Sequence, residues 1–321
     1  MATPIQEKLD TGLAATQALH EAGTAHPDLA TIDITEMLSA DAQSAVFRGV
    51  RDGGRVILKL YFGPRMAERA ERHRDWLLEL AQHMHQGRYR VPKLLGAVPE
   101  AGACITEDVS AAPLSDAIAD ADPAARDRLL HAAGAWYAHL VRPTDRHRRG
   151  QFQAQFWARQ RATGLERAAG AGKAGGDPAL ARALATRLKG FVPALKDLPV
   201  TQVRGHGDLH TRNLLIEGDT IWGIDSENAH FLPIVKDPAR LLVVQHMIAP
   251  RAADDWIGLS AADRDALLGQ LRLSVVEREA LLPFLVGVEL ADRYVNTHLT
   301  SPHGPRLIAA IRAFLQEAHP G

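Results

Sequence analysis

The residues best suited to chemistry lie in one short stretch in the last third of the chain. It contains the triplet His206-Gly207-Asp208, followed by Asn213 and then by Asp225. Kinase-type phosphoryl transfer needs a carboxylate near the attacking hydroxyl, and an amide oxygen and a second carboxylate that hold a metal ion. Asp208 and Asn213 have the D-x-x-x-x-N spacing of such a catalytic loop. The stretch therefore predicts a phosphoryl-transfer site centred on Asp208.

Two short apolar segments separate Asn213 from Asp225. Residues 214–216 and 220–224 are rich in apolar and β-branched side chains, and residues 217–219 between them contain a glycine. This pattern predicts a β-hairpin. Because a hairpin carries the chain out and back, we expect Asp225 to return close to Asn213. Amide and carboxylate oxygens suit Mg²⁺, so these two residues are candidate metal ligands.

The same residues have simpler interpretations when each is taken alone. His206 and His210 have the spacing of two zinc ligands on a helix. Against a zinc site, Gly207 between them is a poor helix former and no third ligand is evident nearby. Asp225 alone fits a turn residue, and Asn213 alone fits a helix cap. Their common order and spacing favour the phosphoryl-transfer interpretation.

At these residues the chain resembles the aminoglycoside phosphotransferase family, a branch of the protein-kinase-like superfamily. The catalytic loop of that family, H-G-D-x-x-x-x-N, is matched at residues 206–213, and its metal motif, I-D-x-E, at residues 224–227. An aspartate that braces the loop in the family is matched by Asp237. The resemblance implies catalysis by Asp208, metal binding by Asn213, Asp225 and Glu227, and loop bracing by His206 and Asp237.

The first third of the chain predicts an antiparallel sheet around one lysine. Residues 44–50 and 55–62 have strand patterns, and residues 51–54 between them contain an Asp-Gly-Gly turn signal. Lys59 is the only lysine of the otherwise apolar second strand. A lysine that faces the interior is costly unless it is paired, whereas an outward-facing lysine on an edge strand is common.

The resemblance implies that Lys59 contacts the α- and β-phosphates of ATP. It also implies that Lys59 pairs with a glutamate of the following helix, which the sequence predicts over residues 65–86. We expect Glu71 to be this partner, with Glu68 or Asp75 as second choices.

Two further segments are expected to meet the nucleotide. The family has a small or glycine-containing loop over the phosphates, whereas the matching residues 38–45 contain no glycine. Ser44 is the candidate phosphate donor there. Strands are predicted over residues 91–98 and 103–109, and the resemblance implies that the backbone from Glu107 to Val109 hydrogen-bonds the adenine edge.

The rest of the chain is mostly helical by its patterns. Asp122-Pro123 predicts the start of a helix, Ser260 another, and Ser274 with Glu277 matches a capping box. We therefore expect an α+β, two-lobed, protein-kinase-like fold with a small antiparallel-sheet lobe and a larger, mostly helical lobe. The expected domains are residues 1–109, with a helical extension over residues 1–30, and residues 110–321.

Composition excludes several classes of protein. The chain has 321 residues, 37 basic and 38 acidic side chains and a net charge of −1, so no global field favours nucleic acid or a membrane surface. The single cysteine, Cys104, excludes an intrachain disulfide framework and fits a reducing compartment. The start of the chain lacks a signal-peptide pattern, and no apolar run has the length of a membrane span. We expect a cytoplasmic protein; its oligomeric state is unknown from the sequence.

The expected function is ATP- and Mg²⁺-dependent phosphorylation of a hydroxyl group on a small molecule. A protein kinase is an alternative, although no D-F-G to A-P-E activation segment is recognisable. A non-catalytic nucleotide-binding regulator is another. In the resembled family, acidic residues of the helical lobe bind substrate amines. Glu289 and Asp292 are candidates, although a solvent-exposed position fits them slightly better, and no dense acidic cluster favours a polycationic antibiotic.

Overall fold

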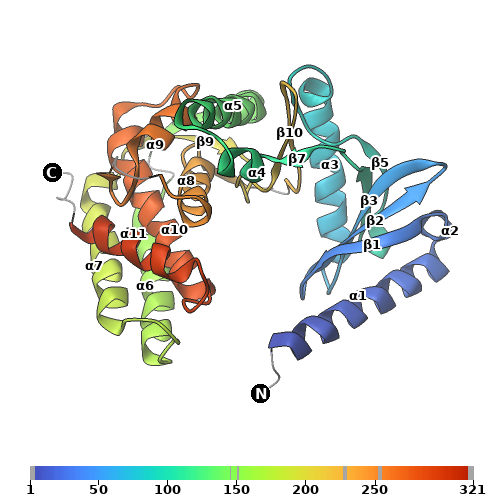
Figure 1. The fold of residues 1–321 in the computed structure, drawn as a ribbon, viewed down its shortest axis with the longest axis horizontal. Helices are drawn as coiled ribbons and strands as arrows, with labels where there is room; N and C mark the ends of the chain where they lie inside the picture. Colours follow the sequence, from blue (N-terminus) through green and yellow to red (C-terminus); the bar gives the residue numbers. More distant parts are fainter. Residues whose placement is uncertain (1–3, 145, 150–151, 227–229, 252–254, 317–321) are drawn as a thin grey trace. The chain divides into compact units, whose positions relative to one another are not determined.

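The computed structural model describes residues 4–144, 146–149, 152–226, 230–251 and 255–316. The chain forms two compact units, described separately here: Met1–Ala111 with Trp222–Ala229, and Ala112–Ile221 with His230–Gly321. The first unit is built on an antiparallel sheet and the second is mostly helical (Figure 1). The predicted α+β fold class is confirmed.

The first unit contains a five-stranded antiparallel sheet in the order β1-β2-β3-β6-β5. Its strands are β1 (Asp33–Ala40), β2 (Ser44–Arg51), β3 (Gly54–Tyr61), β5 (Leu94–Val98) and β6 (Ala103–Glu107). Its other elements are helices α1 (Pro4–Ala25), α2 (Pro27–Ala30) and α3 (Met66–Met84), the 3₁₀ turn η1 (Pro99–Ala101) and the short strand β4 (Tyr89–Arg90). The predicted hairpin is the β2–β3 pair, which has no register shift.

The β2–β3 turn shows why the sequence signal was strong. Asp52 and Gly53 have positive φ angles of 53° and 76°. Tight hairpin turns need this backbone conformation, and aspartate and glycine adopt it readily. The two residues therefore specify the register in which β3, the strand that carries Lys59, pairs with β2.

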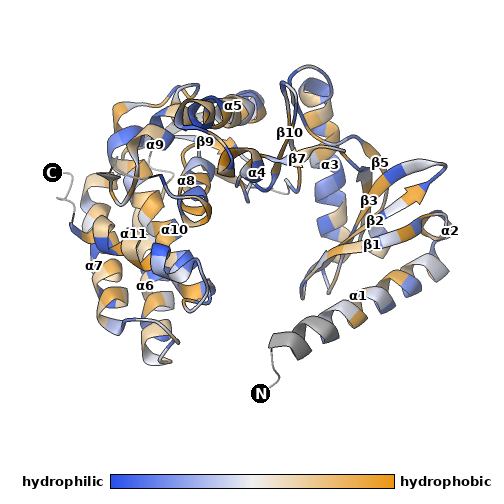
Figure 2. Ribbon diagram, viewed as in Figure 1, coloured by the Kyte–Doolittle hydropathy of each residue, from blue (hydrophilic) through white to orange (hydrophobic). Residues whose placement is uncertain are grey.

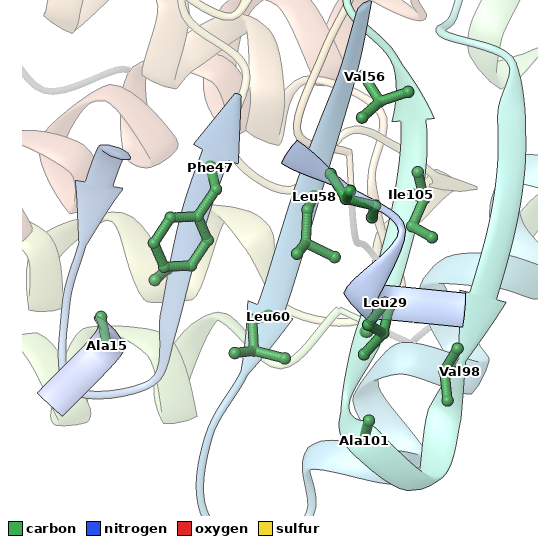
Figure 3. Packing of buried hydrophobic residues seen from close by; sticks show 12 residues of the cluster. Ala15, Leu29, Phe47, Val56, Leu58, Leu60, Val98, Ala101 and Ile105 are labelled. Atoms are coloured by element: carbon green, nitrogen blue, oxygen red, sulfur yellow. The ribbon is translucent and has the colours of Figure 1, made fainter. Parts of the chain in front are cut away.

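Alternation along β3 divides the sheet into two covered faces. Val56, Leu58 and Leu60 are buried in one cluster with Ala15 of α1 and Leu29 of α2 (Figure 3). Tyr61 packs with residues of α3 on the other face. Because side chains alternate along a strand, Lys59 lies on the same face as Tyr61. The N-terminal helices thus pack on one face of the sheet, and the lysine is on the other.

The second unit carries the remaining elements. Its helices are α4 (Leu114–Ala119), α5 (Pro123–Val141), α6 (Ala154–Gly170), α7 (Pro178–Leu195), α8 (Lys236–Ile248), α9 (Ala261–Leu268), α10 (Leu282–Asn296) and α11 (Gly304–Gln316). Its short strands are β7 (Ala112–Pro113), β8 (Arg146–Arg149), β9 (Pro199–Arg204), β10 (Leu214–Glu217), β12 (Phe231–Pro233), β13 (Asp255–Trp256) and β14 (Leu259–Ser260). Single turns are the 3₁₀ helix η2 (Arg142–Thr144) and the π-helix η3 (Glu277–Leu281). Strand β11 (Thr220–Gly223) pairs with β10 and leads the chain back into the first unit.

The core of the second unit is centred on α10. Apolar residues cover most of this helix (Figure 2), and eleven of its fifteen residues are buried, which is typical of a helix surrounded by others.

The predicted helix starts are found. Asp122 accepts a hydrogen bond from the Ala125 N–H at 2.7 Å, and Glu277 accepts one from the Ser274 N–H at 2.8 Å. Among the described residues, no helix is long and apolar enough to cross a membrane.

Candidate functional site

The loop between β9 and β10 is held by one buried carboxylate. Asp237, in the first turn of α8, is 2% exposed. Its Oδ2 accepts the backbone N–H of His206 at 2.6 Å, and both of its oxygens accept the N–H of Gly207 at 3.2 Å. The His206 ring is itself buried, and its Nδ1 accepts the backbone N–H of Asp208 at 3.3 Å. These bonds hold the backbone of the loop and thereby orient the side chain of Asp208.

Two glycines let the backbone take this path. Gly207 has a φ of +88°, a conformation that residues with a side chain rarely adopt. At Gly205 a Cβ atom would lie 2.3 Å from Asp237 Oδ2 and 3.1 Å from Tyr137 Oη. Burial, with a further contribution from Asp237, raises the pKa of Tyr137 well above its usual range, so the phenol stays neutral and donates to the Ile234 carbonyl at 3.0 Å. Gly205 and Gly207 are therefore required by close packing and by backbone conformation.

Asp208 carries a half-exposed carboxylate with one oxygen already engaged. Its Oδ1 lies 2.5 Å from Arg240 Nη2 and 3.7 Å from His210 Nε2. Neither contact involves Oδ2, so within the described residues that oxygen is left to accept a hydrogen bond from outside. A carboxylate with a fixed orientation and one available oxygen suits a group that must receive a proton from a bound hydroxyl.

Asn213 is oriented by the same loop. Its side-chain Nδ2 donates to the Asp208 carbonyl at 3.0 Å, and its backbone N–H donates to the His210 carbonyl at 2.9 Å. The amide nitrogen is thus engaged, and within the described part of the chain the amide oxygen is left as the ligand atom. This orientation fits the expected role of Asn213 as an oxygen ligand for a hard cation.

Burial lowers the pKa of His210 to about 4, from an ordinary value near 6.5. Asp208 opposes this effect, whereas His206, Arg240 and Arg293 add to it. His210 is therefore neutral at pH 7.

The neutral His210 predicts an acid-sensitive contribution to stability. His210 binds a proton below about pH 6.5 in the unfolded state but only below about pH 4 in the folded state. The contribution of neutral His210 to the free energy of unfolding is therefore fully present above pH 6.5 and is lost as the pH falls to about 4. The loss is on the order of 1–3 kcal/mol. Urea unfolding of the metal-free protein between pH 7 and 4.5 should show a weaker pH dependence in His210→Gln than in the wild type. The exposed control His298→Gln should follow the wild type, and equal slopes for all three proteins would contradict the assignment.

In the first unit, Lys59 forms an ion pair with the carboxylate of Asp225. The lysine side chain is 12% exposed and the aspartate 42%. Asp225 has a φ of +62°, which is uncommon for a residue with a side chain and occurs often at functional sites. The next residue, Ser226, is buried and accepts the indole N–H of Trp76 at 2.9 Å. The segment that carries Asp225 is thereby attached to α3.

The structure gives no support to the expected pairing of Lys59 with Glu71. Glu71 is exposed on α3, and the second choices, Glu68 and Asp75, pair with Arg72 and Arg74 of the same helix. Among the residues of α3 that face the lysine strand is His73, whose Nδ1 lies 3.0 Å from Tyr61 Oη. Lys59 Nζ lies 5.4 Å from the centre of the same Tyr61 ring. A sequence search for a carboxylate could not have found this arrangement.

The strand exit where we expect adenine to bind has one available donor. The backbone N–H groups of Glu107 and Asp108 donate to the carbonyls of Lys93 and Arg55. The Glu107 carboxylate is also engaged, by the Lys93 N–H at 2.8 Å. Val109 is the first residue of the exit whose N–H has no acceptor within the described residues. The adenine contact at Glu107 to Val109 stays a prediction, with Val109 as its donor.

The turn between β1 and β2 uses an aspartate where the family has a glycine or another small residue. Asp41 Oδ1 accepts the backbone N–H groups of Gln43 and Ser44 at 2.7 and 2.8 Å. The Ser44 carbonyl accepts the Asp41 N–H. Because both backbone groups of Ser44 are used in the turn, its hydroxyl is the group left to contact a phosphate.

The predicted metal ligands that the structure describes carry the expected oxygen atoms. Asn213, in the second unit, offers an amide oxygen, and Asp225, in the first, offers a carboxylate that is now paired with a cation. Hard oxygen donors of this kind suit Mg²⁺. Glu227 lies outside the described residues. Among those that are described, no three His, Cys, Asp or Glu side chains form a metal site by themselves.

No role was predicted from the sequence for two arginines near Asp208, Arg240 and Arg293. Arg240 lies three residues after Asp237 on α8, a spacing that places both on one side of the helix and could have identified it. Arg293 comes from α10, and no local motif contains it.

Glu289, on the same helix, differs from the expectation of a solvent-exposed position. It is 2% exposed and paired with Lys236.

Comparisons with known proteins give a matching family and several similar folds. The model of the phosphotransferase enzyme family matches residues 35–270. Amicoumacin kinase hAmiN, solved with AMP-PNP, Ca²⁺ and Ami, has a TM-score of 0.60 at 15% identity, covering 94% of this chain and 95% of its own. A thermostable mutant of aminoglycoside phosphotransferase APH(4)-Ia has a TM-score of 0.57 at 14% identity, with 92% and 98% covered.

A third similar structure is a choline/ethanolamine kinase family protein from Mesorhizobium loti. Its TM-score is 0.54 at 15% identity, and the match covers 92% of this chain and 98% of that one. At these identities the likeness shows the fold alone. No curated protein sequence matches the chain.

Proposed function

The chain belongs to the phosphotransferase enzyme family, and on that basis we propose that it transfers the γ-phosphoryl group of ATP to a hydroxyl group of a small molecule. The observation that carries the proposal is the Asp208 carboxylate, presented by a loop whose backbone is bonded to Asp237 and held through one oxygen only. The similar solved structures are also small-molecule kinases by name, which supports an acceptor of that class.

In the proposed reaction, Asp208 Oδ2 accepts a hydrogen bond from the acceptor hydroxyl and orients its oxygen. That oxygen forms a bond to the γ-phosphorus, the bond from the γ-phosphorus to the bridging oxygen breaks, and ADP leaves with the electron pair. Asp208 receives the hydroxyl proton as the new bond forms. Arg240 keeps the carboxylate in this orientation by holding Oδ1.

The remaining predicted residues bind and position. Lys59 contacts the α- and β-phosphates, the Ser44 hydroxyl a further phosphate oxygen, and the Val109 N–H the adenine edge. Asn213 and Asp225, with Glu227, would hold Mg²⁺, which when bound neutralises phosphate charge. Lys59 would then exchange its ion pair with Asp225 for contacts with the phosphates. Most of the rate comes from such positioning and charge neutralisation.

A screen of ATP consumption with Mg²⁺ tests the proposal. Hydroxylated metabolites, sugars, amino alcohols and aminoglycosides serve as acceptors, and each active one is confirmed by detecting its phosphorylated product. We expect turnover with at least one acceptor and none with Asp208→Ala. ATP binding without turnover on any acceptor would contradict a small-molecule kinase and favour a regulator. Turnover that Asp208→Ala retains would contradict the site.

A further inference from the structure

Charged side chains from two packed helices gather beside Asp208. Lys236 and Arg240 are one turn apart on α8, and Glu289 and Arg293 are one turn apart on α10, which packs on α8 (Figure 1). Lys236 and Glu289 form a buried ion pair. One turn further along each helix, Arg240 and Arg293 lie near enough for their like charges to repel.

The three carboxylates that act on Arg293 are each paired with another cation: Asp208 with Arg240 at 2.5 Å, Glu289 with Lys236, and Asp292 with Arg161 at 2.9 Å. Arg293 is half-buried and has no ion pair of its own within the described residues. These pairs therefore leave the Arg293 guanidinium without an ion-pair partner of its own among the described residues.

The position of Arg293 disfavours its charged form. Burial lowers the pKa of Arg293, and the neighbouring charge of Arg240 lowers it further, against the opposing effects of Glu289, Asp208 and Asp292. Arg240 adds a second unsatisfied group, because its Nε is a buried donor that has no acceptor among the residues that the structure describes. The planar fork of arginine matches the oxygens of carboxylates and phosphates, so an oxoanion would satisfy both side chains.

We propose that the acceptor is a hydroxyl compound with an anionic oxoacid group, a carboxylate or a phosphate, which binds at Arg240 and Arg293. This inference rests on the proposed function and specifies its substrate class. The anionic group anchors the acceptor so that its hydroxyl reaches Asp208 Oδ2. A polycationic acceptor meets two guanidinium groups at the same place and is repelled.

Binding of inorganic phosphate tests the anion site without requiring turnover. Isothermal titration compares the wild type with Arg293→Met, with Lys59→Met, and with Arg312→Met, an exposed control on α11. We expect saturable binding that Arg293→Met weakens about tenfold or more, and that the two other variants retain. The site is overturned if the wild type binds no phosphate, if Arg293→Met binds as the wild type does, or if Lys59→Met removes all binding.

Thermal unfolding shows whether Arg293 has a structural role instead. Removal of an unpaired, half-buried charge should leave the melting temperature unchanged or raise it, because burial and the charge of Arg240 both oppose the guanidinium. A melting temperature well below that of Arg312→Met would mean that Arg293 supports the fold, and would overturn the assignment.

Four acceptors with the same vicinal diol test the substrate class: glycerol, glycerate, glycerol phosphate and aminopropanediol. We expect the highest kcat/KM with glycerate or glycerol phosphate, and whichever of the two is better identifies the anionic group. Arg293→Met should raise KM for that acceptor about tenfold and leave KM for ATP unchanged.

The outcomes separate the inference from the proposed function. Preferred turnover of glycerol or aminopropanediol overturns the inference and leaves the kinase proposal standing. A raised KM for ATP in Arg293→Met overturns it too, since the arginine would then bind the nucleotide. Phosphate binding that depends on Arg293, with no transfer to any acceptor here or in the wider screen, supports the anion site and contradicts the kinase function.

Discussion

Asp208→Asn should lower kcat by about 10²–10⁴-fold while the protein stays folded and still binds nucleotide. The amide keeps the shape of the carboxylate but cannot take the proton of the acceptor hydroxyl. The loop itself should be unchanged, because its backbone is bonded to Asp237 and not to the Asp208 side chain. Product formation with the best acceptor from the screen measures kcat, and fluorescence titration with AMP-PNP measures nucleotide binding.

A matched variant separates the loss of a base from the loss of a charge. Asp219→Asn makes the same replacement at an exposed turn between β10 and β11 and should keep the wild-type kcat. Arg240→Gln should lower kcat less than Asp208→Asn, since it removes the orientation of the carboxylate but leaves the base. Wild-type kcat in Asp208→Asn would rule out the role proposed for this residue.

The second large effect is expected at Asp237. Asp237→Ala removes the acceptor of two backbone N–H groups at buried His206 and at Gly207. A buried donor without an acceptor costs about 1–3 kcal/mol, so the free energy of unfolding should fall by roughly 2–5 kcal/mol. Activity should fall as well, even under conditions where the variant is folded, because the loop no longer holds Asp208 in place. Urea unfolding and kcat on the same preparations measure both effects.

Gly205→Ala should reproduce this phenotype without altering a polar group. Its Cβ would lie 2.3 Å from Asp237 Oδ2, so either the carboxylate or the loop must move. Gly170→Ala is the matched control, because a Cβ there meets nothing within 4 Å. If Gly205→Ala had the stability and kcat of Gly170→Ala, the bonding of the loop to Asp237 would not be what positions Asp208.

The local elements could be predicted because neighbouring residues specify them. The β2–β3 hairpin follows from an Asp-Gly pair that adopts positive φ, and α5 begins directly after Asp122 because the side chain of this residue accepts a backbone N–H of the first turn. The H-G-D-x-x-x-x-N spacing likewise identified the loop that Asp237 holds. These features depend on interactions within a few residues of the chain, or on a motif in which several positions agree.

The tertiary structure decided which side chains meet from distant parts of the chain. The sequence predicted a glutamate of α3 beside Lys59, whereas in the structure Asp225 forms an ion pair with Lys59, and His73 is among the α3 residues that face the lysine strand. The helix pattern could not show this, because several acidic residues of α3 fit a partner equally well until its rotation against the sheet is known.

The surroundings of Asp208 also depend on packing rather than on local pattern. The sequence by itself determined a braced carboxylate in a phosphotransferase loop and gave no acceptor. Only the packing of α8 on α10 places Arg240 and Arg293 close together and pairs Glu289 with Lys236. Lys236 and Glu289 are 53 residues apart in the chain, so no local sequence pattern shows that they pair. The pairing of these charges, and with it the expected charge of the substrate, is therefore decided by the tertiary structure.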